Sequence, residues 1–103
     1  MGLIIARGAT AEFTQPLPFG VEKIAEARLT IKQGEQEIIS RSLAQLQAEG
    51  KSVTVALSQE DTLQFTAGMP ALIEIRLRLQ SGAACTTGIR GIEVLDTLYE
   101  GVV

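Results

Sequence analysis

The sequence predicts an all-β protein: an antiparallel sandwich of two sheets with about seven strands and one short helical turn near residues 58–65. Apolar and polar residues alternate with period two in several segments, as expected of strands that bury one face. Turn-forming residues separate these segments at short intervals, and no helical pattern is long enough to cross a sheet. Two packed sheets explain these observations, and a small barrel is the alternative architecture.

Three segments carry the strongest alternation, residues 25–32, 52–58 and 71–79. Successive side chains of a strand point to opposite faces, so each segment has an aliphatic face and a mostly polar one. In the first segment the alternation also places Ala25 on the aliphatic face. We expect one continuous core between the two sheets, formed by Ala27, Leu29, Ile31, Val53, Val55, Leu57, Ala71, Ile73, Ile75, Leu77 and Leu79.

Four further strands have weaker patterns and complete the sandwich. Residues 38–49 are ambiguous, because Ile39, Leu43 and Leu46 also recur at helical spacing. We favour strands there, since β-branched isoleucines open the segment and Gly50 can supply the positive φ of a turn. The four strands are expected in residues 12–17 with Phe13 facing inward, in residues 36–42, in residues 46–49 and in residues 89–98.

A capping box predicts the one helical turn. Ser58 is followed three residues later by Asp61, with apolar residues on both sides. Aspartate reaches back less easily than the usual glutamate or glutamine. Residues 68–70, which end in Pro70, stop this turn and restart the chain as a strand. Residues 81–82 are expected to form the tip of a hairpin.

Size and charge restrict the partners. The chain has 103 residues and 11.0 kDa, which fits one domain spanning residues 1–103. Its formal net charge of -3 has the wrong sign for a nucleic-acid-binding domain. We expect no membrane span and no signal peptide, because no long apolar run is present and the first residues lack a basic region. A bacterial cytoplasm or a virion is the expected location, and the single cysteine agrees with a reducing compartment.

The composition leaves little room for catalysis. There is no His and a single Cys, which excludes Ser-His and Cys-His nucleophiles and His-metal sites. Five carboxylates are candidates for acid/base pairs, but adjacent carboxylates on a capping turn are better explained by interactions with the helix dipole and solvent. We therefore predict no enzyme activity, no cofactor and no catalytic or metal-binding residue. The carboxylates are Glu60, Asp61, Glu93, Asp96 and Glu100.

Other candidate residues also have structural explanations. Cys85 is expected to be a small half-buried strand residue, since the chain has no His that could activate it as a nucleophile. Tyr99 is the single tyrosine, too little for a sugar-binding aromatic platform. Glycines 82, 88 and 91 lack the spacing of a phosphate-binding loop and are expected in turns or bulges. Arginines 76, 78 and 90 are interpreted as an outward polar strand face instead of an anion site.

Several segments together resemble a set of small uncharacterised proteins encoded in prophages of Gram-positive gut bacteria. That set has an Arg-Gly-Thr-like start, a strand ending in Gln, and a turn of the form Leu-(Thr/Ser)-Gln-Glu-(Glu/Asp)-Thr-Leu-x-Phe. Here the turn is Leu-Ser-Gln-Glu-Asp-Thr-Leu-Gln-Phe, and Ala9-Thr10 departs from the commoner Thr-Thr or Thr-Pro. The matching segments are residues 7–20, 27–33, 55–65, 71–79 and 95–103.

The same layout is similar to the immunoglobulin-like N-terminal domain of phage baseplate upper proteins, which tethers tail parts together. This resemblance implies an immunoglobulin-like sandwich and a structural role in a phage tail or baseplate, and it brings no catalytic residues. The alternative is a soluble prophage-encoded binding or regulatory protein that holds a host protein or a small ligand.

Both ends of the chain are apolar, although chain ends are normally polar. Residues 2–5 and 98–103 are the segments concerned, and neither contains a Pro or Lys that would guard a sheet edge. We therefore predict self-association, or docking onto other tail proteins, through the termini and sheet edges. Removing residues 98–103 should weaken that association.

Overall fold

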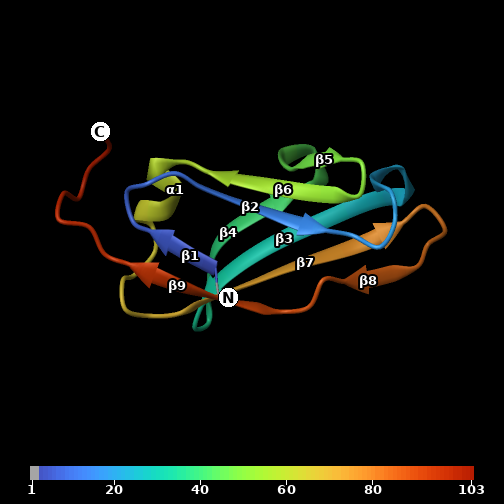
Figure 1. Cartoon of the computed structure of the whole chain (residues 1–103). Coiled ribbons are helices and arrows are strands. Elements are labelled where there is room, and N and C mark those ends of the chain that lie inside the picture. Colours follow the sequence, from blue (N-terminus) through green and yellow to red (C-terminus); the bar gives the residue numbers. More distant parts are fainter. Residues whose placement is uncertain (1–2) are drawn as a thin grey trace.

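The computed structural model describes residues 3–103 as a β-sandwich with a six-stranded and a three-stranded sheet (Figure 1). The predicted fold class is confirmed. Three short helical segments connect strands: η1 (Val21–Lys23), η2 (Leu43–Gln45) and α1 (Gln59–Leu63). The strands are β1 (Leu3–Ala6), β2 (Ala11–Pro16), β3 (Ile24–Gln33), β4 (Gln36–Ser42), β5 (Gln47–Glu49), β6 (Ser52–Leu57), β7 (Ala71–Leu79), β8 (Ala84–Thr86) and β9 (Arg90–Leu95).

The larger sheet has the order β1-β9-β7-β3-β4, with β8 pairing the second half of β7. The smaller sheet has the order β2-β6-β5. All strand pairs within residues 3–103 are antiparallel except one, because β1 runs parallel to β9. The first and last strands therefore lie side by side, and β1 forms an edge of the larger sheet.

The predicted core is present between the sheets. The central pair, β3 and β7, places Leu29 opposite Ile75 and Ile31 opposite Ile73, so their aliphatic faces coincide. Every predicted core residue is buried apart from Leu79, which is partly buried against the cluster. This register also sends the polar positions of both strands to the outer face. The strands beside the centre add Ile5, Ile92 and Val94 to the core.

One expected core position is wrong. Ala25 is only partly buried, and Ile24 is buried in its place. The pairing with β7 passes from Ile24 to Glu26, so Ala25 is the extra residue of a β-bulge. A bulge interrupts strict alternation, which the sequence pattern alone does not reveal.

Residues 38–49 form strands, as predicted, and not a helix. β4 ends at Ser42, a single 3-10 turn follows, and β5 begins at Gln47. Leu46 is buried, while Leu43 packs on the core only in part. The helical spacing of Leu43 and Leu46 therefore reflects a tight turn, which begins at Leu43 and is followed directly by Leu46. Gly50 in the next turn has φ +58°, as its predicted role requires.

The strand count and the end of β9 differ from prediction. The described residues contain nine strands, because β1 and the three-residue β8 form separate elements that the alternation does not predict. Strand β9 ends at Leu95 instead of continuing to residue 98. The hairpin tip at residues 81–82 is confirmed, since the Gly82 N–H donates to the Leu79 carbonyl over 2.9 Å. No helix within residues 3–103 has the length and apolar character needed to cross a membrane.

Candidate functional site

The C-terminal residues 96–103, called the tail from here on, follow β9 without forming regular structure. Figure 1 shows the tail swinging away from β9 and returning towards α1. It is held by polar contacts from two directions. The tail also exposes apolar side chains. This end of the molecule is therefore the candidate site.

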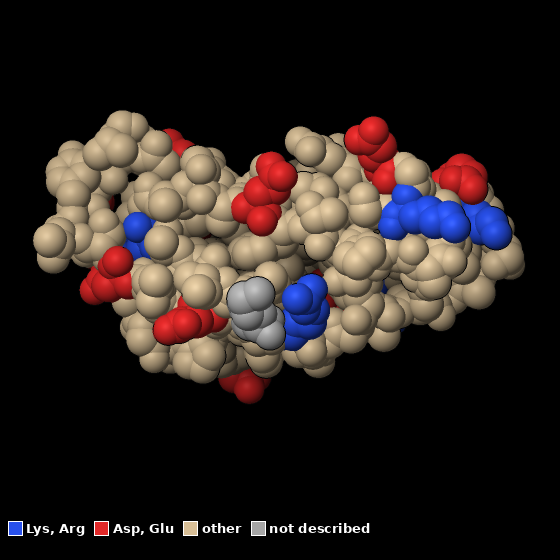
Figure 2. All heavy atoms as spheres, viewed as in Figure 1, with Lys and Arg blue, Asp and Glu red and all other residues tan. Residues whose placement is uncertain are grey.

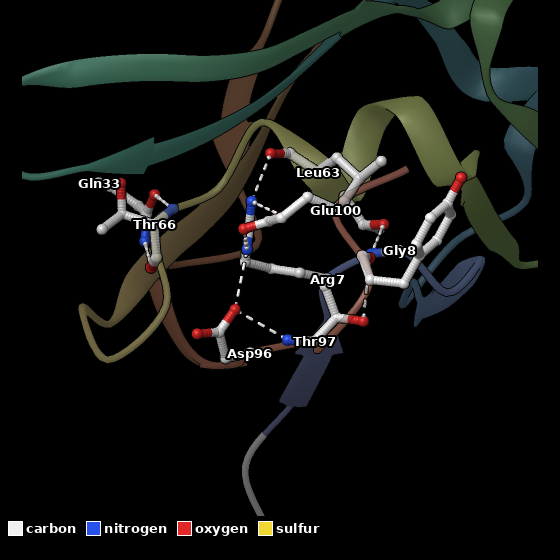
Figure 3. A network of polar contacts seen from close by, with 10 residues as sticks. Arg7, Gly8, Gln33, Leu63, Thr66, Asp96, Thr97 and Glu100 are labelled. Atoms are coloured by element: carbon white, nitrogen blue, oxygen red, sulfur yellow. Dashed lines mark hydrogen bonds and ion pairs between the residues drawn. The ribbon is translucent and has the colours of Figure 1, made fainter. Parts of the chain in front are cut away.

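Arg7 fixes the start of the tail (Figure 3). Its guanidinium contacts the Asp96 carboxylate at 2.8 Å and the Glu100 carboxylate at 2.9 Å. It also donates to the Leu63 carbonyl over 3.3 Å, and its side chain is only 14% exposed. The bonds to Glu100 and Asp96 raise the pKa of Arg7, and the Thr97 N–H together with Arg7 lowers the pKa of Asp96. Because both carboxylates are largely exposed, water screens these pairs, and they position the tail more than they stabilise the fold.

Gln59 fixes the end of the tail. Its side-chain carbonyl accepts from the Val103 N–H over 2.8 Å, and its amide donates to the Val103 carbonyl over 3.1 Å. This pair of bonds imitates the pairing of two strands. The tail is thus bound through backbone and charged atoms, which leaves its apolar side chains free.

The loop after β1 is tied to α1 by a buried hydroxyl. The Gly8 N–H donates to Thr62 Oγ1 over 3.0 Å, and Thr62 Oγ1 donates to the Ala9 carbonyl over 2.9 Å. Thr62 is fully buried, so these bonds satisfy a polar group that has no access to water. Gly8 has φ +84°, a conformation that suits glycine. This loop therefore positions Arg7 against the tail.

A second buried polar residue, Gln33, holds the segment before β7. Its amide donates to the Thr66 and Met69 carbonyls at 2.9 and 2.8 Å, and its carbonyl accepts from the Thr66 N–H at 2.8 Å. The Gly68 N–H in the same segment donates to the Val94 carbonyl of β9 over 3.2 Å. Residues 66–69 are thereby fixed alongside β9.

Exposed apolar side chains gather at this end. Within residues 3–103, all large hydrophobic residues that are exposed belong to β1, the start of β7 and the residue pair before it, the segment from 89 to 95, or the tail. The smaller sheet contributes none of them. Scattered exposed hydrophobics are ordinary, whereas a cluster marks an interaction surface. The residues are Ile4, Met69, Leu72, Ile89, Leu95, Leu98, Tyr99, Val102 and Val103.

A groove of about 860 Å³, called the β9 groove from here on, lies within this cluster. It is lined by Leu3, Ile4, residues 67–70 and residues 91–96. Gly91 lies on its outer strand face, paired with Leu72 of β7. Gly91 lines the groove, and a β-carbon built on it would meet no atom within 4 Å, so the groove is open at this position, called the hollow at Gly91 from here on.

The predicted carboxylates separate into different roles. Asp61 completes the predicted capping box, since it accepts from the Ser58 N–H over 2.9 Å while Ser58 Oγ accepts from the Asp61 N–H over 3.1 Å. Burial raises the pKa of Asp61, but these bonds and Arg41 at 3.1 Å outweigh it and lower the pKa overall. Asp96 and Glu100 share Arg7, a contact between opposite ends of the chain that no local pattern predicts. Glu93 lies on β9 opposite Ile4.

The three arginines do not form one face. Arg76 and Arg78 point outward on β7, and Arg28 lies directly opposite Arg76. The prediction that Arg90 joins them is wrong: it is paired with the core-facing Ile73 and donates to Gln15 of the smaller sheet over 3.3 Å. Side chains alternate between the two faces of a sheet, and Arg90 falls on a position that faces the core side, whereas Arg76 and Arg78 fall on outward positions.

The remaining candidate residues lie in strands, in turns or on the tail. Cys85 lies in β8 and packs partly against the core, as predicted. Glycines 82 and 88 have positive φ in turns, as expected. Gly91 lies instead within regular strand β9. Tyr99 lies on the tail, with its ring over Gly101. In the part of the chain from Leu3 onward, no three His, Cys, Asp or Glu side chains are grouped so as to hold a metal.

Comparisons with known proteins show the fold. No protein family and no curated protein matches the sequence. The structure is similar to CopC from Methylosinus trichosporium OB3b, with a TM-score of 0.63 and 12% identity, covering 95% of this chain and 89% of that one. It is also similar to the extracellular domain of mouse leukocyte-associated immunoglobulin-like receptor 1, with a TM-score of 0.55 and 8% identity, covering 91% and 87%. The chain therefore has an immunoglobulin-like β-sandwich fold.

Proposed function

We propose that this chain is a structural module of a phage tail or baseplate that holds other protein chains and performs no catalysis. Its working surface is the end formed by β1, β9 and the tail. The module contributes protein contacts, and its partners are further copies of itself or other tail proteins.

One observation carries the interaction role: the exposed large hydrophobic residues of the described chain lie in β1, β9, the segments next to β9 and the tail, and none lies in the smaller sheet. Such an apolar cluster beside an edge strand is the usual form of a protein-binding surface. The assignment to a phage particle is supported by the sequence resemblance to prophage proteins and to the N-terminal domain of baseplate upper proteins. An immunoglobulin-like sandwich is compatible with that resemblance.

The alternative role, holding a small ligand, has less support within the sandwich. The cavity between the two sheets, lined by Phe13, Leu29 and Ile75 among others, has a volume of about 20 Å³. Typical ligand sites have volumes of roughly 300 to 1,000 Å³. The larger β9 groove is an open surface feature with an apolar rim, which suits a protein segment better.

The experiment is to induce the prophage, purify particles on a density gradient and search them for this chain by mass spectrometry. Antibody labelling in the electron microscope then locates it. The expected result is that the chain copurifies with particles and that label appears on the tail of the particle. Recovery of the chain solely in the particle-free fraction would contradict the proposal.

A further inference from the structure

We propose that the β9 groove binds the tail of a second copy of this chain, so that two copies dock reciprocally about a two-fold axis. Leu98 of each copy enters the hollow at Gly91 of the other. This inference rests on the proposed function, because it identifies the surface through which such a module would hold a protein chain.

The first argument is the glycine itself. Glycine within a strand weakens the strand and is explained by a bulge, a special backbone conformation or the close approach of another chain. Gly91 does not have a left-handed φ, and no atom lies within 4 Å of the place where its β-carbon would be. The other glycines of residues 3–103 either have positive φ or have a side chain close to the place that a β-carbon would take. Of the three explanations, close approach of another chain is the one that the position of Gly91 in the groove favours.

The second argument is the tail. Leu98 is fully exposed and Val103 is 93% exposed, although the tail is tied at both ends by Arg7 and Gln59. A flexible apolar tail would collapse onto its own domain, whereas this one presents its side chains outward. Figure 2 shows the loop of the tail projecting at the upper left with a mostly uncharged surface, and its two carboxylates, Asp96 and Glu100, are paired with Arg7. Such a projection is suited to an apolar hollow on another molecule.

The third argument is the position of the groove and the tail relative to each other. Asp96 lines the β9 groove and is also the first residue of the tail, so the two surfaces are continuous. A two-fold axis beside this point brings each tail to the other copy's groove, which is the isologous arrangement common in dimers. Covering the exposed apolar side chains of both copies would bury on the order of 1,500 Å², as in standard interfaces.

The test uses two variants that alter opposite sides of the contact. Gly91→Arg fills the hollow, and Leu98→Asp removes the apolar side chain that enters it. Both positions are exposed, so circular dichroism should show an unchanged fold, and the melting temperature should match that of the wild type at concentrations where both are monomeric. Ala56→Arg is the matched control for Gly91→Arg, because Ala56 is an exposed strand residue of the smaller sheet. Sedimentation equilibrium should show dimerisation at least about 30-fold weaker in either variant and unchanged in the control.

The decisive step is to mix the two variants. In the mixed dimer one contact has the native Leu98 and Gly91, and the other places the introduced aspartate against the introduced arginine, an oppositely charged pair. Mixing should therefore restore dimers that neither variant forms alone. A copy-to-copy contact elsewhere would not produce this rescue.

Three results would overturn the inference: a wild-type chain that is monomeric at micromolar concentration, variants that dimerise as the wild type does, or a mixture that stays monomeric. The fold of Leu98→Asp is secure because the side chain is fully exposed, so the test stands even if Gly91→Arg misfolds. The particle experiment above is independent. Rescue without particle association would sustain the interface and reject the phage role, and the converse would reject this interface alone.

Discussion

The two chain ends are similarly apolar in sequence but differ in how far the structure buries them. From Leu3 onward the N-terminal segment forms β1, pairs with β9 and contributes the fully buried Ile5 to the core, while Gly2 lies outside the described residues. The C-terminal segment becomes the tail, whose Leu98 is fully exposed. The sequence pattern predicts that both ends need cover. An apolar terminus is therefore either covered by its own domain or left exposed, and strand pairing decides which.

The largest expected effect separates the two ends directly. Ile5→Ala should lower the free energy of unfolding by about 2 to 5 kcal/mol, because it removes buried methyl groups and leaves a cavity. At protein concentrations low enough to keep the chain monomeric, Leu98→Ala should change it by less than about 0.5 kcal/mol, since the side chain is exposed in the single chain and has little packing to lose. Urea unfolding of both variants measures the difference. Equal losses would show that the tail is part of the core.

The next contrast is between Gln33, which is hydrogen-bonded to residues 66–69, and Gln59, which is hydrogen-bonded to the end of the tail. Gln33→Leu should cost about 2 to 4 kcal/mol, because three partly buried backbone groups of residues 66–69 lose their partner. Gln59→Leu should cost less than about 0.5 kcal/mol, since water replaces it at Val103. Thermal unfolding of the two proteins provides the measurement. A stable Gln33→Leu protein would mean that residues 66–69 are not held in this way.

The capping turn tests a region that belongs to neither end. Ser58→Ala should lower stability by about 1 kcal/mol, the usual value of a helix N-cap, because the Asp61 N–H loses its acceptor. Ser52→Ala is a suitable control, since its hydroxyl makes one exposed bond to the Glu49 carbonyl. Chemical denaturation of both should separate them. An unaffected Ser58→Ala protein would contradict the capping geometry.

The smallest effect concerns acid. The folded state lowers the pKa of Asp61, so the unfolded state binds a proton more readily. The stabilisation is complete above the unfolded pKa of about 3.9 and is lost as pH falls through the lower, folded value. Asp61→Asn should therefore flatten the loss of stability below about pH 4. A pH profile as steep as that of the wild type would contradict this assignment.

Much of the fold could be predicted because alternation is a local signal. The core faces of β3, β6 and β7 and the capping box at Ser58 follow from residues adjacent in sequence. The bulge at Ala25 could not, because it depends on the register with β7. Strand β1 escapes prediction for a related reason, since four residues show too little alternation to identify a strand.

The candidate site could be predicted in part. The apolar ends are visible in composition, but their different outcomes follow from the parallel pairing of β1 with β9, a contact between the two extremes of the chain. The role of Arg7 depends on Asp96 and Glu100, which are separated from it by most of the sequence. Gly91 can be recognised as unusual from the sequence alone, because a glycine inside an otherwise regular strand indicates the close approach of another backbone as well as a turn.

Sedimentation equilibrium of the wild-type chain tests most directly whether the tail and the β9 groove join two copies. The expected result is a mass of twice 11.0 kDa at micromolar concentration, falling towards the single-chain value on dilution. A mass of 11.0 kDa at all concentrations would contradict the proposed interface.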